Sequence, residues 1–63
     1  MIETEAKIEA YLTRRVGEIL SEPGPQARSF GKSSFMMSTQ VLADAGLITH
    51  DRKFEWNERV VWL

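Results

Sequence analysis

The chain has 63 residues, no Cys and one His, so it forms at most a single domain over residues 1–63, and neither a disulfide nor a structural zinc site is expected. Its apolar content of 43% is typical of a folded chain, and its net charge of -1 argues against a strongly basic nucleic-acid binder. No apolar run approaches the roughly 18 residues of a membrane span, and the start of the sequence is acidic where a signal peptide is basic. We therefore expect a cytoplasmic protein with no membrane partner.

The first segment predicts an amphipathic helix from about residue 3 to residue 21. The sequence Glu-Pro-Gly-Pro at 22–25 ends this helix, because a proline disfavours helical geometry in the residue before it. The apolar residues of the segment recur at spacings of three and four, which is the period of a helix with one buried face: Ile8, Leu12, Val16, Ile19 and Leu20.

The segment at 25–30 is compatible with two structures. Pro25 at a first helical position and Gly31 just past an end would frame a short helix, and a short extended segment fits nearly as well. Of the two, the short helix is our prediction.

The next segment predicts a second full helix over 33–45. Ser33 or Ser34 provides the N-cap, because a serine hydroxyl accepts a hydrogen bond from a backbone N–H two or three residues later. Gly46 ends the helix, since glycine adopts the left-handed conformation of a Schellman motif without a Cβ penalty.

The C-terminal segment predicts a β-hairpin. Residues 48–54 and 59–63 carry Ile, Thr, Phe, Val and Trp, which are enriched in strands, and residues 56–59 form the natural turn between them.

A long helix, a short helix, a second full helix and a hairpin resemble the winged helix-turn-helix superfamily, and most closely its small repressors of the ArsR or MarR type. Residues 33–35, Ser-Ser-Phe, look like the Ser-Thr-Val opening of their recognition helix, and residues 41–48 look like its Leu-x-x-x-Gly-Leu-Ile ending. The resemblance covers 32–63 and implies an α+β fold with a recognition helix at 33–45 and a hairpin wing. The chain departs from the family at Thr39, where most relatives place a buried aliphatic residue.

This resemblance implies a small DNA-binding protein, either a transcriptional regulator or an architectural factor, whose partner is double-stranded DNA. Gln can read adenine in the major groove, Ser can contact bases or phosphates, and Lys and Arg neutralise phosphates. On a hairpin edge, however, cations also serve to block edge-to-edge pairing. The residues expected to contact DNA are Arg28, Lys32, Ser33, Ser34, Met36, Gln40, Arg52 and Lys53.

A different class of function also agrees with the near-zero net charge. The same scaffold could be an accessory module that binds a larger protein through Met36, Trp56 and the hairpin edge. A homodimer through the first helix or the terminal Trp residues is expected in either case, because so small a chain gains stability from a partner copy. No nucleophile with a base and no Gly-rich phosphate loop is recognisable, so an enzyme and a cofactor are not expected.

Overall fold

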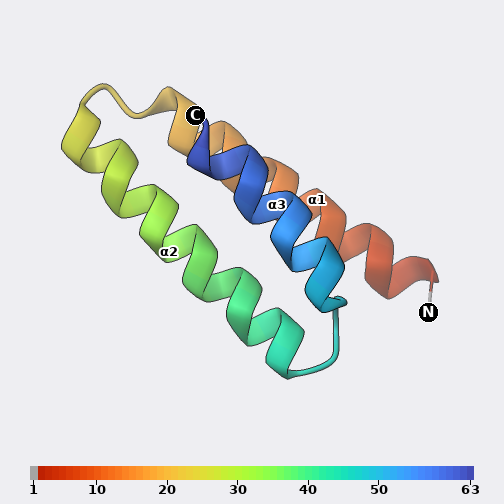
Figure 1. Ribbon diagram of the computed structural model, residues 1–63. Coiled ribbons are helices and arrows are strands. Elements are labelled where there is room, and N and C mark those ends of the chain that lie inside the picture. The colour runs from red at the N-terminus through yellow and green to blue at the C-terminus, as the bar shows by residue number, and fades with distance from the viewer. Residues whose placement is uncertain (1) are drawn as a thin grey trace.

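The computed structural model is a bundle of three helices, and it describes residues 2–63, with side chains from residue 4 onward (Figure 1). Helix α1 spans Ile2–Ser21, α2 spans Pro25–Asp44 and α3 spans His50–Val61. The chain runs up, down and up again, so α2 is antiparallel to both of its neighbours (Figure 1). The bundle is elongated, with extents of 37 × 18 × 15 Å. None of the described helices combines the length and the apolar character that a membrane span requires.

Helix α1 confirms the predicted first helix. Its periodic apolar face places Leu12 and Ile19 in the core. The helix closes where the Pro-Gly-Pro sequence begins, and the Glu22 N–H donates to the Ile19 carbonyl at 3.2 Å.

Helix α2 corrects the predicted division between a short helix and a recognition helix, because residues 25–44 form one continuous helix. Pro25 begins it, and its fixed φ and missing N–H are tolerated at a first helical position. Gly24 is the N-cap, in an extended conformation and without a side-chain hydrogen bond, so neither Ser33 nor Ser34 caps this helix.

Gly31 was predicted to end a helix and instead lies inside one. A Cβ at this position would lie 3.1 Å from Ile19 Cγ1, which is closer than most real Cβ contacts. Glycine therefore lets α1 and α2 approach each other closely at this point. The reason for this glycine is a tertiary contact, which local sequence does not show.

The predicted glycine stop of α2 is confirmed at Gly46, which has a φ of 75°. Its N–H donates to the Ala43 carbonyl at 3.0 Å, and the Leu47 N–H donates to the Leu42 carbonyl at 2.9 Å, which is the Schellman pattern. The helix ends at Asp44, one residue earlier than expected.

Helix α3 shows that the predicted β-hairpin is wrong, and the described part of the chain contains no strand. Thr49 is the N-cap, and its hydroxyl accepts from the Arg52 N–H at 3.0 Å. Lys53, Trp56 and Val60 are buried at spacings of three and four, which is a helical period. Packing on this face outweighs the strand propensity of Phe, Val and Trp, so the fold is all-α and not an α+β winged helix.

The core lies where the three helices meet. Phe35 from α2 is fully buried and packs its ring 6.2 Å from that of Trp56. Thr39 is also fully buried, and its Oγ1 lies 2.8 Å from Asn57 Oδ1 on α3. This hydrogen bond satisfies the buried hydroxyl, so Thr39 can occupy the core. The buried apolar cluster consists of Leu12, Ile19, Phe35, Trp56 and Val60.

Candidate functional site

Two of the four cations expected to bind DNA contact the ends of neighbouring helices. Arg28 donates from Nε to the Glu22 carbonyl at 3.2 Å and from Nη2 to the Leu20 carbonyl at 3.4 Å. Lys32 donates from Nζ to the Val61 carbonyl at 3.4 Å. Carbonyls at the end of a helix lack intrahelical partners and carry a partial negative charge, so both cations stabilise helix C-termini.

The other two cations join α3 to the rest of the bundle. Arg52 donates from Nε to Glu9 Oε1 at 2.7 Å and also pairs with Glu55. These hydrogen bonds, first to Glu55 and then to Glu9, raise the pKa of the Arg52 guanidinium above its ordinary value. Lys53 is only 9% exposed, and its Nζ donates to Gln40 Oε1 at 2.9 Å.

The four remaining residues of the predicted DNA site are all on α2 but lie on different sides of it. Ser33 and Ser34 line a groove beside α1, whereas Gln40 bonds to Lys53 and to Asp44. Met36 is half-buried. The structure therefore does not gather the eight residues on one face, and DNA binding by them stays a prediction.

Trp56 was expected to contact a larger protein, but it is only 4% exposed and is the centre of a cluster that the sequence analysis did not predict. Its Nε1 donates to Glu9 Oε2 at 2.8 Å, and the guanidinium carbons of Arg52 and Arg59 lie 5.4 and 4.7 Å from the centre of its ring. Thr49 as a helix N-cap, followed by apolar residues at helical spacing, was the signal that could have revealed it. Trp56 is buried, Glu9 and Arg52 are partly exposed and Arg59 is exposed. The cluster holds α1 and α3 together, and Glu9 and Arg52 also line a hollow of about 600 Å³ between α1 and the loop that leads into α3.

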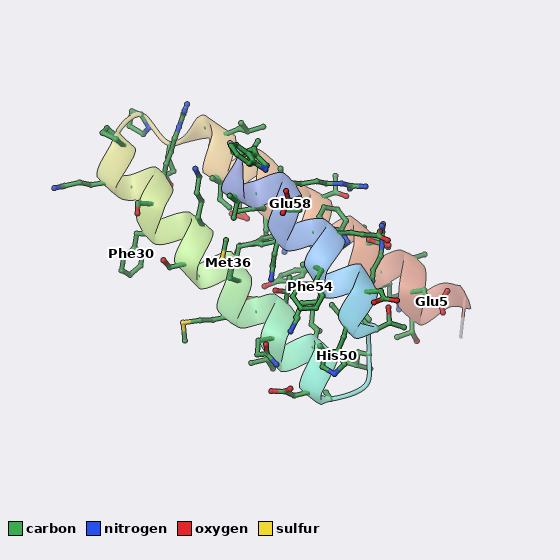
Figure 2. All side chains as sticks on the ribbon, viewed as in Figure 1. Glu5, Phe30, Met36, His50, Phe54 and Glu58 are labelled. Carbon is green, nitrogen blue, oxygen red and sulfur yellow. The ribbon has the colours of Figure 1, made fainter. Side chains whose placement is uncertain are left out.

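A groove runs between α1 and α2 and has a volume of about 590 Å³. Phe35 faces the core, and Met37 follows two residues later, about 200° further around the helix. The groove therefore runs along the side of α2 next to α1: Leu42 at its inner edge packs against the core, and Met37 at its outer edge faces away from the core. Figure 2 shows Phe30 on this outer side, pointing away from α3, whereas Phe54 belongs to α3.

The outer side of α2 is apolar and largely exposed. The exposed fractions are 79% for Phe30, 71% for Met37 and 66% for Val41. Tyr11 of α1 and Leu42 of α2 complete the apolar lining. Three large apolar side chains exposed on one side of one helix, beside a groove, make this side of α2 a candidate interaction surface.

Three serines separate the large apolar side chains along the groove. Ser38 Oγ donates to the Ser34 carbonyl at 3.1 Å, and Ser34 Oγ accepts from Arg15 Nη2 at 3.1 Å. Arg15 also donates from Nη1 to the Tyr11 hydroxyl at 2.8 Å. Since the hydroxyls of Ser34, Ser38 and Tyr11 already have partners, covering them with an apolar surface leaves few polar atoms unsatisfied.

Phe30 and Ser34 also line a smaller hollow of about 370 Å³ that reaches Ala27. Unlike the groove, this hollow has a charged rim, formed by Arg15, Glu18 and Glu22. From Ala27 to Leu42 the distance along α2 is about 22 Å, at a rise of about 1.5 Å per residue. The complete groove is thus about four helical turns long.

Comparisons of the chain with protein-family models, with curated proteins and with solved structures gave no match. The groove and the packing around it are the features of the molecule that bear on its function.

Proposed function

We propose that this chain is a protein-interaction module that binds an amphipathic α-helix in the groove between α1 and α2. The observation that carries the proposal is the uncharged, exposed apolar strip formed by Phe30, Met37 and Val41, beside an open groove. A helix laid along the groove would present anchors at intervals of three and four residues, which is how helices bind apolar grooves. The bundle would then gain a fourth helix.

The length and chemistry of the groove set what it can bind. About four turns correspond to a partner helix of about 15 residues. Full burial of a Phe, Met or Val side chain contributes about 1.5–3 kcal/mol, so the strip contributes about 3–6 kcal/mol after scaling by its exposure. This is comparable to the lower estimates of the cost of association. The bound helix must therefore contribute an apolar face of its own.

DNA binding remains the second candidate, and its support lies in the residue types of the predicted site alone. The recognition helix and wing that placed those residues against a duplex are replaced by three helices in the described chain. All four cations of the predicted DNA site already make hydrogen bonds within the bundle: Arg28, Lys32, Arg52 and Lys53. Binding DNA would compete with these hydrogen bonds, whereas binding a helix in the groove would leave them intact. The apolar groove is therefore the better-supported surface.

The test is an NMR titration of the isotope-labelled protein with synthetic helical peptides. The backbone amide chemical shifts of the protein report binding. One peptide carries a leucine stripe, and a second carries serines in the same positions. We expect the leucine peptide alone to shift the amides around Tyr11, Phe30, Met37 and Val41. Shifts confined to other regions, or no shifts, would contradict the proposal.

A matched pair of variants makes the test specific. Phe30→Ser removes an exposed aromatic ring from the groove. Phe54→Ser is the control, because it removes an exposed aromatic ring of similar exposure, 64%, from α3 outside the groove. We expect the first substitution to weaken peptide binding at least tenfold and the second to leave it unchanged. Equal weakening by both would show that the peptide binds apolar surface without selecting the groove.

A further inference from the structure

We infer that the helix bound in the groove is α2 of a second copy of this chain, packed antiparallel about a two-fold axis. This inference rests on the proposed function and names its partner. A two-fold interface requires a patch that is complementary to itself. The exposed strip of α2 has this property.

The order of large and small residues along the strip is self-complementary. When two α2 helices are antiparallel and centred between residues 35 and 36, Phe30 of one copy lies opposite Val41 of the other. In the same register Met37 lies opposite Ser34. The serines in the middle keep the helix axes close, and the large side chains pack against each other at the two ends.

The charges of α2 favour the same arrangement. The strip itself carries no charged side chain, because Lys32, which lies between Phe30 and Val41 in the sequence, is directed to the Val61 carbonyl on α3. The centres of the two strips therefore meet without like-charge repulsion. Asp44 at the end of α2 would lie opposite Ala27 in the first turn of the partner's helix. That turn has no acidic residue and its N-cap makes no side-chain hydrogen bond. An incoming carboxylate would stabilise its free N–H groups and would meet both Arg15 and the like charges of Glu18 and Glu22, which line the hollow beside Ala27.

The exposed surface of one copy is larger than a compact monomer needs. It measures 4542 Å² for 7.2 kDa, whereas a folded monomer of this mass is expected to expose roughly 4,100 Å². A stable dimer buries about 800 Å² on each partner. The excess of about 400 Å² belongs to the surface of the whole elongated bundle, so the groove and its rims have to supply the area that the dimer buries.

The first test is sedimentation from low micromolar to millimolar concentration. We expect a mass that approaches twice that of the chain, and a dissociation constant raised at least tenfold by Phe30→Ser and by Met37→Ser, with Phe54→Ser as the unaffected control. Met37→Ser is the second variant because its side chain is 71% exposed, so it keeps the test valid if Phe30→Ser perturbs folding. Asp44→Asn should raise the dissociation constant about two- to fivefold at low salt.

Disulfide trapping tests the register, since the chain has no cysteine of its own. A mixture of the Ser34→Cys and Met37→Cys chains should form the mixed disulfide on oxidation. A preference for the Ser34→Cys chain pairing with itself would indicate parallel helices and overturn the arrangement. A dimer weakened by Trp62→Ser and not by Phe30→Ser would place the contact at the end of α3 and also overturn it.

The outcomes separate this inference from the proposed function. If the chain sediments as a single copy at all concentrations but still binds the leucine peptide in the groove, the partner is a different protein and only this inference fails. If the chain is a single copy and the peptide does not bind, both fail.

Discussion

The two sides of α2 differ sharply although they belong to one helix. The side facing α3 holds Phe35 and Thr39 with no exposed surface, and the opposite side holds Phe30 at 79% exposure. Both sides carry large apolar residues, so α2 is apolar on more than one face. A helix that is apolar beyond the face its own bundle covers has surface available for another molecule. The comparison separates the apolar residues that fold the chain from those available to a partner.

Polar contacts follow the same division. On the side of α2 that faces α3, here called the closed side, Thr39 bonds to Asn57 and Gln40 bonds to Lys53. These bonds fix α2 and α3 in one register. On the side that lines the groove, here called the open side, Ser38 bonds within α2 and Ser34 bonds to Arg15 of α1. Substitutions on the two sides should therefore affect different properties: the free energy of unfolding on one side, and association on the other.

The largest difference is expected between Phe35→Ala and Phe30→Ala. Removing the buried ring should cost about 3–5 kcal/mol, which is most of the roughly 3–9 kcal/mol expected for a chain of this length. Removing the exposed ring should change the free energy of unfolding by less than about 0.5 kcal/mol when the chain is dilute enough to be monomeric. Urea denaturation followed by Trp fluorescence measures both, and equal losses would refute the distinction.

Gly46→Val tests the loop that connects α2 to α3 and so holds the two helices together on the closed side. We expect a loss of about 1–3 kcal/mol, because a β-branched residue is strained at a φ of 75°. The position is open, so no clash contributes to this loss. Unchanged stability in thermal or urea unfolding would mean that the left-handed turn is not required.

Thr39→Val tests the buried hydrogen bond on the closed side. Valine has nearly the same shape but leaves Asn57 Oδ1 without its donor, so we expect a loss of about 1–2 kcal/mol. The matched substitution on the groove side is Ser38→Ala, whose effect should stay within about 0.5 kcal/mol because its hydroxyl bonds only within the helix. If the two substitutions cost the same, the hydrogen bond between α2 and α3 contributes little.

The smallest effects are expected from two glycines. Gly17→Ala meets nothing within 4 Å and should stabilise the chain by up to about 1 kcal/mol through helix propensity. Gly31→Ala has the same propensity gain, but its Cβ would meet the buried Ile19 at 3.1 Å. We expect it to gain less than Gly17→Ala or to destabilise. Equal stabilisation in thermal unfolding would show that the contact between α1 and α2 can relax.

How far local sequence predicts this structure depends on whether the cause of each feature is local. The first helix and its end follow from apolar periodicity and from Pro23 and Pro25, and the end of α2 follows from Gly46. The local sequence predicts a helix end at Gly31, because nothing near it in the chain reveals Ile19, which lies close to it across the bundle. A glycine that ends a helix and a glycine that admits a neighbouring helix look alike in sequence.

The third helix was missed because one of its buried positions is a lysine. The period set by Lys53, Trp56 and Val60 is helical, but a charged residue in the first of these positions hides it, and the β-branched and aromatic residues favoured a strand. The bond from Lys53 to Gln40 makes its burial possible and cannot be inferred from spacing. The groove was also beyond prediction, because it depends on which side of α2 the third helix covers.

Glu9 has a consequence for the order in which the bundle opens. Its carboxylate bonds to Arg52 and Trp56, which lie 43 and 47 residues later in the chain. The bonds between α2 and α3 link residues 13, 18 and 29 apart. Long chain closures are entropically the more costly, so the hairpin of α2 and α3 should form before α1 docks. In native-state hydrogen exchange, the amides of α1 should then exchange through a partial opening that leaves α2 and α3 protected, and Glu9→Gln should speed exchange in α1 more than in α2.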